Sequence, residues 1–379
     1  MAEYLTNTTD LTKVASAIRE KGGTSDLLVY PDGFVTAIQA IQTGTELQII
    51  VSVTSGATVT ATKGSNVVSG TSVNGTCTLV VPEAGTWSVK ATLNGQTSDT
   101  KSVTFTDSYA LTLYFVSAVL NDNDWETIKA VSDKGDGANY WSIGDRKAVT
   151  LNGTVGHLTL SNYTTYAFII GFNHNASVEG ANRIHFQLAK TALSGGTDVC
   201  FCDNQYAPDS GWTAPGAGYF VMNARNTNSG GWKSSQMRTN ICGTSLSSYS
   251  GTIIAVIPAA LRAVLKSVTK YTNNAGNNSS AGAVTATTDY FFLLSEFEVF
   301  GSISYANSNE KNKQAQYTYY SAGNSKIKYK HNGTSTDAYW WFRSPRSGYS
   351  YGFVFVYING TVSYDSADRS LGFAPGFCV

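Results

Sequence analysis

Histidines are the residues of this chain best suited to metal binding or proton transfer, and there are four: His157, His174, His185 and His331. None stands in an H-E-x-x-H or similar ligand spacing, and the sequence has no G-x-S-x-G motif for a nucleophilic serine. His185 lies in the alternating segment 184–186, which favours a structural role in a strand over catalysis. The sequence therefore predicts that the chain is not an enzyme, with no catalytic residues, no metal site and no cofactor.

Cysteine is the second residue type that could carry chemistry, and the chain has five: Cys77, Cys200, Cys202, Cys242 and Cys378. An odd and sparse set argues against a disulfide framework. Cys200-Phe-Cys202 has no second cysteine pair or histidine at zinc spacing after it. We therefore expect buried free thiols.

Two charged motifs could be taken for ion or nucleic-acid sites, but ordinary structure explains them better. Residues 121–124 read Asn-Asp-Asn-Asp, without the glycine and distal glutamate of a calcium loop, and they precede a helical pattern that Asn or Asp can cap. Lys326, Lys328 and Lys330 alternate with Ile and Tyr, as on an edge strand protected by lysine. We expect a capped helix and an edge strand at these places.

The densest aromatic cluster, residues 339–342, opens a carboxyl-terminal segment with a composition of its own. Asn359-Gly360 stands between two strand-forming runs, so residues 353–358 and 361–365 are predicted to pair as a hairpin. Tyr, Ser and Gly supply 12 of the 26 residues from 346 to 371, as in antibody loops, where tyrosine gives contact area at low entropic cost. This composition fits a binding surface, and equally an ordinary hairpin with interior aromatics.

Elements upstream must position this segment. Apolar residues at i, i+3, i+4 and i+7 predict a short helix capped by Asp10, and Pro31 opens a second one with Phe34 and Ile38 on one side. Helices this short need a partner to be stable in water. Residues 1–45 are therefore predicted to form a helical attachment and oligomerisation module.

From residue 46 to residue 108 the apolar period changes to two. Short alternating runs are separated by turn signals such as Asn74-Gly75 and Asn94-Gly95. Five or more strands at this spacing predict a small immunoglobulin-like β-sandwich, which we interpret as a spacer. The pattern resets around residues 106–109.

Residues 109–379 are predicted to form one large α+β domain. Helical patterns occur at residues 124–131 and 258–268, and many short strands alternate with loops rich in Gly, Asn and Ser. The expected fold class is thus multidomain: a short helical module, a β-sandwich, and an α+β domain with two helices.

Composition excludes several classes of protein. The 26 basic residues equal the 26 acidic ones, so no charge excess favours nucleic acid as a partner. An apolar content of 42% argues against disorder. The longest apolar stretch, residues 253–265, is interrupted by Pro258 and Arg262, and the first residues lack a signal-peptide pattern. We expect a soluble chain without membrane insertion.

Two elements near the end of the chain carry a family resemblance: Trp-Trp-Phe-Arg-Ser-Pro at 340–345 and the final octet 372–379. They resemble the carboxyl-terminal region of variable proteins of diversity-generating retroelements. Four upstream segments are similar to the same domain: 140–145, 170–174, 231–238 and 294–301.

The resemblance covers roughly residues 111–379. It implies a C-type lectin fold of the formylglycine-generating-enzyme branch and a homotrimer. Residues 11–41 resemble an attachment module of phage and prophage tail proteins of Gram-positive bacteria. The sequence has neither the paired-cysteine metal site of the enzyme relatives nor the Glu-Pro-Asn triplet of calcium-dependent sugar-binding lectins.

The resemblance also implies a variable region, at about residues 344–379. The family's mutagenesis acts on template adenines, usually in AAY codons, so that diversified positions read as NNY codons. Such codons encode neither Lys, Glu, Gln, Met nor Trp, and none of these five types occurs among the 36 residues of this region. The composition agrees with diversification.

Positions where the family template carries asparagine are implied to form an exposed ligand-binding surface: Arg346, Gly348, Tyr349, Tyr351, Gly352, Phe355, Tyr357, Ile358, Asn359, Ser363, Tyr364, Asp365, Asp368, Arg369 and Leu371. Thr361 and Ser366 border this set. Six residues are expected to be buried beneath it: Trp340, Trp341, Phe353, Val356, Val362 and Phe377.

The sequence thus predicts a hypervariable receptor-binding protein, or adhesin, of a phage or prophage tail. Its expected partners are a host bacterial surface protein or glycan and, through the N-terminal module, tail or baseplate proteins. It would be made in the bacterial cytoplasm and would act at the tail tip of the virion. The alternative is a bacterial surface-displayed adhesin or lectin of the same fold outside any virion. An enzyme related to formylglycine generation is the third hypothesis.

Overall fold

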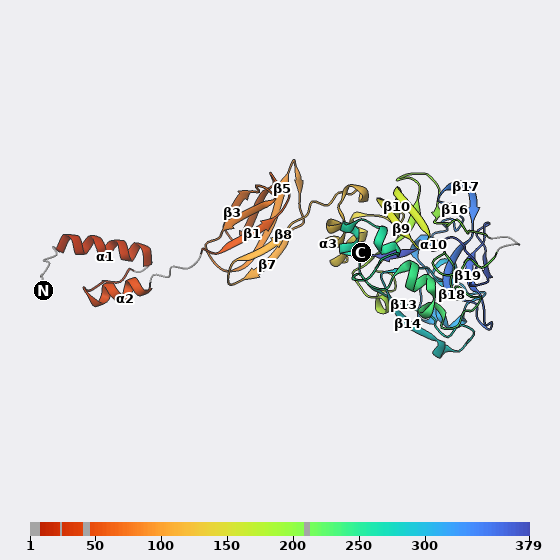
Figure 1. The fold of residues 1–379 in the computed structure, drawn as a ribbon. Coiled ribbons are helices and arrows are strands. Elements are labelled where there is room, and N and C mark those ends of the chain that lie inside the picture. Colours follow the sequence, from red (N-terminus) through yellow and green to blue (C-terminus); the bar gives the residue numbers. More distant parts are fainter. Residues whose placement is uncertain (1–7, 23–24, 41–45, 208–212) are drawn as a thin grey trace. The chain divides into compact units, whose positions relative to one another are not determined.

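The computed structural model describes residues 8–22, 25–40, 46–207 and 213–379. The chain divides into two compact units, Met1–Phe115 and Val116–Val379. Strands in several separate sheets, with a few helices, make up each unit's secondary structure (Figure 1). The predicted β-rich, multidomain architecture is confirmed at this level. Within the described ranges, no helix has both the length and the apolar character needed to cross a bilayer.

The first unit begins with two helices, α1 (Thr8–Gly22) and α2 (Asp32–Ala40). Their shared core is small and consists of Ala15, Ile18 and Phe34. Since α1 begins at Thr8, Asp10 lies in its first turn and is not the residue before it. Parts of the predicted 1–45 module, namely residues 1–7, 23–24 and 41–45, lie outside the described residues, and the attachment role of the module stays a prediction.

Eight short strands follow in two sheets: β1 (Gln48–Ser52), β2 (Thr58–Lys63), β3 (Asn66–Thr71), β4 (Thr76–Val80), β5 (Gly85–Leu93), β6 (Gln96–Thr97), β7 (Lys101–Phe105) and β8 (Tyr109–Thr112). One sheet has the order β4-β1-β8, and the other has β3-β2-β5-β6 with β7 also on β5. Alternate residues of the strands, among them Trp87 and Val89, fill the core of this part of the chain. Asn74 and Asn94, in two of the predicted turns, have positive φ. β8 pairs parallel with β1, so this unit continues to Phe115, beyond the predicted boundary at residue 108.

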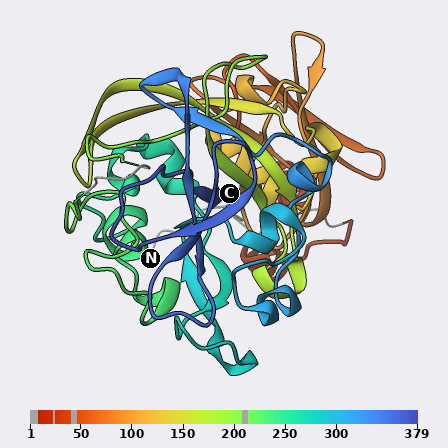
Figure 2. The ribbon, with the colours of Figure 1, turned by 90° about the vertical axis from the view of Figure 1, so that its right-hand side faces the viewer.

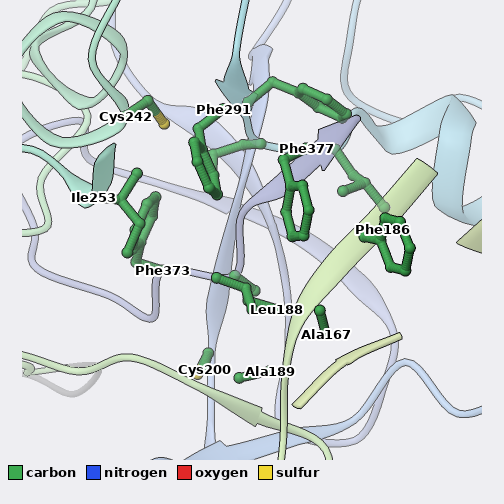
Figure 3. Close-up of a cluster of buried hydrophobic side chains, with 14 of the residues drawn as sticks. Ala167, Phe186, Leu188, Ala189, Cys200, Cys242, Ile253, Phe291, Phe373 and Phe377 are labelled. Carbon is green, nitrogen blue, oxygen red and sulfur yellow. The ribbon is translucent and has the colours of Figure 1, made fainter. Parts of the chain in front are cut away.

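The central sheet of the second unit has the order β15-β21-β11-β10-β9. Its strands are β9 (Arg146–Val155), β10 (Leu158–Phe172), β11 (Ile184–Lys190), β15 (Phe291–Phe292) and β21 (Gly376–Cys378). The chain therefore ends inside the unit, on its central sheet (Figure 2). Phe377 is the register partner of both Phe186 and Phe291, and its ring centroid lies 5.2 Å from each of theirs (Figure 3).

Helix α3 (Trp125–Asp133) confirms the first helical pattern, and the Asp124 carboxylate caps it by accepting a hydrogen bond from the Thr127 amide at 2.7 Å. The second pattern is only partly right, because α8 (Ala259–Val264) ends early. Beyond it the Lys266 amide donates to the Cys378 carbonyl, and Val268 begins strand β13 (Val268–Asn273), which pairs with β14 (Val284–Asp289). Pairing with distant strands overrides the helical pattern there.

The expectation of only two helices in this region is wrong. The described part of this region has six further helices of four or five residues: α4 (Gly137–Tyr140), α5 (Ala176–Glu179), α6 (Gly231–Ser234), α7 (Ile253–Val256), α9 (Glu296–Phe300) and α10 (Thr318–Ser321). A helix of one turn is too short to show a repeating apolar pattern in the sequence.

The lysine-rich strand is not an edge strand. β16 (Lys328–Lys330) lies between β12 (Val199–Cys200) and β17 (Gly333–Ala338). Lys328 is only 1% exposed, and its ammonium group lies over the ring of Trp340 at 5.1 Å. The alternation marks a strand correctly, but its lysine face is turned partly into the protein. All five cysteines are buried and unpaired, as predicted.

Candidate ligand-binding surface

Three antiparallel strands carry the carboxyl-terminal aromatic segment: β18 (Trp340–Pro345), β19 (Phe353–Val356) and β20 (Val362–Asp365). β19 and β20 pair from Phe353 with Asp365 to Val356 with Val362, which confirms the predicted hairpin. The Gly360 amide donates to the Tyr357 carbonyl at 2.8 Å, and Gly360 has φ +81°. Ile358 and Asn359 thus form the centre of a tight turn that Gly360 completes in the left-handed region.

β18 pairs with β19 at one side of the hairpin and is buried along its whole length. The Trp340 and Trp341 indole nitrogens donate to the carbonyl oxygens of Lys326 at 2.9 Å and Phe220 at 3.1 Å. Of the six residues expected to be buried under the surface, five are fully buried and Val362 is half-buried. The predicted burial of these six residues is therefore confirmed except at Val362, which lies next to the hairpin turn.

The fifteen predicted surface residues fall into three groups. Five are exposed: Gly348, Tyr349, Tyr351, Tyr357 and Asn359. Five are half-buried: Ile358, Ser363, Tyr364, Asp365 and Arg369. The bordering residues Thr361 and Ser366 are exposed and half-buried, respectively.

Exposure was wrongly predicted for the other five: Arg346, Gly352, Phe355, Asp368 and Leu371 are buried. Phe355 packs edge-on against Tyr339 and Trp341, with ring centroids 5.2 and 6.0 Å apart. Leu371 lies beside β18, and its amide donates to the Phe220 carbonyl. A side chain at Gly352 would meet the Asp365 carbonyl oxygen 2.8 Å away. Arg346 is covered by two tyrosine rings, and Asp368 lies in the turn after β20.

Tyrosine rings enclose the Arg346 guanidinium group. Its central carbon lies 3.2 Å from the centroid of the Tyr349 ring and 3.4 Å from that of Tyr364. Tyr364 also packs edge-on against Tyr305, and Tyr349 against Tyr351. Cation–π contacts of this kind stabilise by about 0.5–2 kcal/mol each, so they hold the aromatic side chains in defined positions.

Asn228, which the sequence analysis did not single out, holds the loop at residues 346–352. Its side-chain nitrogen lies 2.9–3.2 Å from the main-chain oxygens of four residues, Arg346, Tyr349, Tyr351 and Gly352. Its own amide donates to the Ser350 carbonyl at 3.1 Å. Every one of these contacts is made to main-chain atoms of the loop, so none depends on the identity of the loop's side chains. One Asn among the several at residues 223–228 gives no local signal of this role.

Charged groups on the surface are balanced. Arg369 and Asp365 form an ion pair at 2.7 Å. Burial raises the pKa of Asp365 and that of Asp368 above their usual values. With two arginines and two aspartates, the surface presents no excess of one sign to a ligand.

A buried ionic network supports β18 from below. Arg343 makes two hydrogen bonds with Glu298, at 2.5 and 2.8 Å. Lys270 Nζ lies 2.9 Å from Glu298 and 2.6 Å from Glu179. Burial alone would raise the pKa of Glu298, but the charges of Arg343 and Lys270 outweigh it and hold that pKa well below its usual range.

His174, Glu179 and Glu298 are close enough together to hold a metal ion. The Lys270 ammonium group already contacts both carboxylates, however, and so supplies the cation between them. Desolvation lowers the pKa of His174 to about 3, so it is neutral at physiological pH. The chemistry of this cluster is that of a structural ion network, sealed from water.

A cavity of about 460 Å³ lies at the turn of the hairpin. Tyr206, Lys330, Asp337, Tyr339 and Ile358 are among its lining residues. Of these only Ile358 belongs to the predicted surface, so the cavity walls come mostly from outside the variable region.

Comparison with known protein families identifies one match. Residues 218–379 match the family described as "Domain of unknown function (DUF6273)". The matched segment contains Asn228, the ion network residues Lys270, Glu298 and Arg343, and the whole of the hairpin sheet. No curated protein matches the sequence.

Proposed function

We propose that this protein is a receptor-binding protein of a phage or prophage tail, in which the variable region, residues 344–379, carries a diversified surface that binds a protein or glycan on a host bacterium. The observation that carries the proposal is the way Asn228 holds the 346–352 loop through main-chain oxygens. Such a loop can change its side chains without losing its anchor. A surface that varies while its scaffold stays constant needs this arrangement.

Exposed aromatic side chains support a binding role. Tyr349, Tyr351 and Tyr357 are 45%, 39% and 37% exposed and lie within nine residues of one another. Tyrosine buries a large area on binding at a low cost in side-chain entropy, and clustered exposed aromatics are typical of interaction surfaces. Stacking on Arg346 orders Tyr349 before any ligand arrives.

Five of the fifteen predicted surface residues are buried and cannot contact a ligand directly. Phe355 and Leu371 are part of the core, so we assign direct contact to the ten exposed and half-buried residues from Gly348 to Arg369. The five buried ones act by shaping the surface from below. In this proposal no metal ion takes part in binding.

We further assign the sandwich to the immunoglobulin-like type and the second unit to the C-type lectin fold of the variable proteins. The helical module would attach the chain to tail or baseplate proteins, and three copies would form a homotrimer. Several weak contacts made at once then give a high avidity.

Sequencing the gene and its flanking DNA in many independent isolates tests the diversification. We expect an asparagine-rich template repeat beside a reverse-transcriptase gene, with substitutions concentrated in codons such as those of Tyr349, Tyr351 and Tyr357. The codons of Asn228, Trp340 and Trp341 should stay constant. Substitutions spread evenly over the gene would contradict the proposal. Virion structural genes next to this one would separate a tail protein from a cell-surface adhesin.

A further inference from the structure

A cavity of about 570 Å³ lies outside the predicted ligand-binding surface, since none of the residues of that surface lines it. Its walls come from β9, β11, α10, β17 and the segment before β16. The volume falls within the range of small-molecule sites, roughly 300–1,000 Å³. Most of its lining side chains are polar, among them Arg146, Lys190, Tyr319, Asn324 and Thr334.

Positive charge is in excess around this cavity. Lys190 is only 5% exposed; its ammonium group is paired with Asp198 and donates to the Tyr319 hydroxyl at 3.0 Å. Arg146 donates from Nη1 to the carbonyl oxygens of Ala192 and Gly195, which carry no formal charge. One carboxylate therefore faces two cations in the cavity wall.

A third cation lies just behind the wall. The Lys328 ammonium group is buried and has no hydrogen-bond partner among the described residues. Lys328 and Lys190 share the Phe168 ring, at 5.5 and 4.5 Å from its centroid, and both interact with the charge of Asp198. Burial lowers the pKa of Lys328 to about 8.

A buried ammonium group without a hydrogen-bonded partner is costly, and the charge of Asp198, which Lys190 already pairs with, and contacts with aromatic rings offset only part of that cost. An anion in the neighbouring cavity would supply the missing negative charge. Thr197, Tyr319, Ser325 and Thr334, each with a hydroxyl group, line the same space and are suited to a ligand that carries hydroxyl groups of its own.

We propose that this cavity binds a saccharide that carries one acidic group, with the acid directed toward Arg146 and Lys190. Carboxylate and phosphate share this chemistry, and both occur on sugars of bacterial surface polymers. The cavity adjoins the hairpin, because Ile327 in its wall lies 3.2 Å from the position that a side chain at Gly360 would occupy. The inference does not rest on the function proposed for the hairpin.

Thr334 offers a matched pair of variants. It is exposed, lines the cavity and makes no side-chain hydrogen bond among the described residues. Thr334→Glu places a carboxylate at the cavity, and Thr334→Gln places an uncharged side chain of the same size there. Thermal unfolding should be the same for both variants, since the position is on the surface.

Ligand-observed NMR titrations of the full chain with glucuronate, glucose 6-phosphate and glucose test the proposal. We expect one or both acidic sugars to bind at least about tenfold more tightly than glucose, and the two will show which acid is preferred. Thr334→Glu should weaken that binding about tenfold or more relative to Thr334→Gln. Equal affinity for glucose and both acidic sugars, or equal affinity of the two variants, would overturn the proposal.

A third variant separates this site from the hairpin. Tyr357→Ser should bind the acidic sugar as the wild type does, because Tyr357 does not line the cavity. If the acidic sugars do not bind, the proposal for the hairpin surface is unaffected. If the hairpin surface proves not to bind a host ligand, the sugar titrations still test the cavity.

Discussion

The side-chain nitrogen of Asn228 lies 2.9 Å from the main-chain oxygen of Tyr349. Asn228 is buried and lies more than a hundred residues before the loop that it holds, whereas Tyr349 is the most exposed aromatic side chain of the hairpin region. The contact joins a fixed interior to a side chain that points into solvent. Because it is made to the main chain, it constrains the position of Tyr349 and not its identity.

Replacing Asn228 by Leu should loosen the 346–352 loop. The change removes an NH₂ group whose two hydrogens are shared among four carbonyl oxygens, and leaving buried polar groups unpaired costs about 1–3 kcal/mol. We expect a decrease of that size in the free energy of unfolding in urea and faster proteolysis within the loop. Asn332→Leu is the control, since Asn332 is exposed. Equal stability of the two variants would argue against the anchoring role.

Substitutions in the variable region should differ in how much they lower the free energy of unfolding, depending on whether the side chain is buried or exposed. Leu371→Ala removes a fully buried side chain and should cost about 2–5 kcal/mol. Tyr357→Ala removes an exposed ring that packs on Tyr339 and should cost about 1 kcal/mol or less. Urea unfolding of both variants measures the difference, and similar losses would show that the burial of these positions is misassigned.

Lys270 should be far more important for stability than a surface lysine. Lys270→Met leaves Glu179 and Glu298 short of a buried partner, and breaking a buried ion pair in this way costs about 3–5 kcal/mol. Lys129→Met is the matched control, because it removes the same charge from an exposed pair with Asp133, which contributes about 0.2–1 kcal/mol. Comparable losses in the two variants would contradict the role of the network.

Acid should weaken the protein partly through His331. Its Nδ1 accepts a hydrogen bond from the Cys202 amide at 3.1 Å, and burial lowers its pKa to about 4. Between pH 6.5 and about 4, His331 binds fewer protons in the folded protein than in the unfolded chain. The stability that neutral His331 contributes is therefore complete above pH 6.5 and is lost as the pH falls toward 4. The loss from one such group is at most about 1.4 kcal/mol per pH unit. The free energy of unfolding, measured in urea from pH 4 to 8, should fall less steeply with decreasing pH in His331→Gln than in the wild type. The same pH dependence in both proteins would contradict the role of His331.

Local signals in the sequence predicted the local elements. Asp124 before an apolar pattern correctly marked the start of α3, and Asn359-Gly360 marked the hairpin turn. Of the eight strands that the structure describes in residues 46–115, alternating runs in the sequence marked five, namely β1, β2, β4, β5 and β7. These elements depend on neighbours within a few residues, so their information is contained in short segments.

Features that depend on distant contacts could not be predicted in this way. Phe355 and Leu371 were expected on the surface, but Phe355 packs against Tyr339 and Trp341, and Leu371 is fully buried. Lys328 alternates like a residue of an exposed strand face and is buried because β12 and β17 flank β16. The role of Asn228 likewise exists only once the 346–352 loop is folded against it.

The binding of labelled, purified protein to a panel of intact bacterial strains tests the central claim most directly. The variant Tyr349→Ser, Tyr351→Ser, Tyr357→Ser is compared with Tyr30→Ser, Tyr109→Ser, Tyr140→Ser, which removes three comparably exposed tyrosines elsewhere. We expect the first variant to lose attachment to every strain that the wild type binds, and the second to attach as the wild type does. Equal attachment of the two variants would contradict a ligand-binding surface on the hairpin.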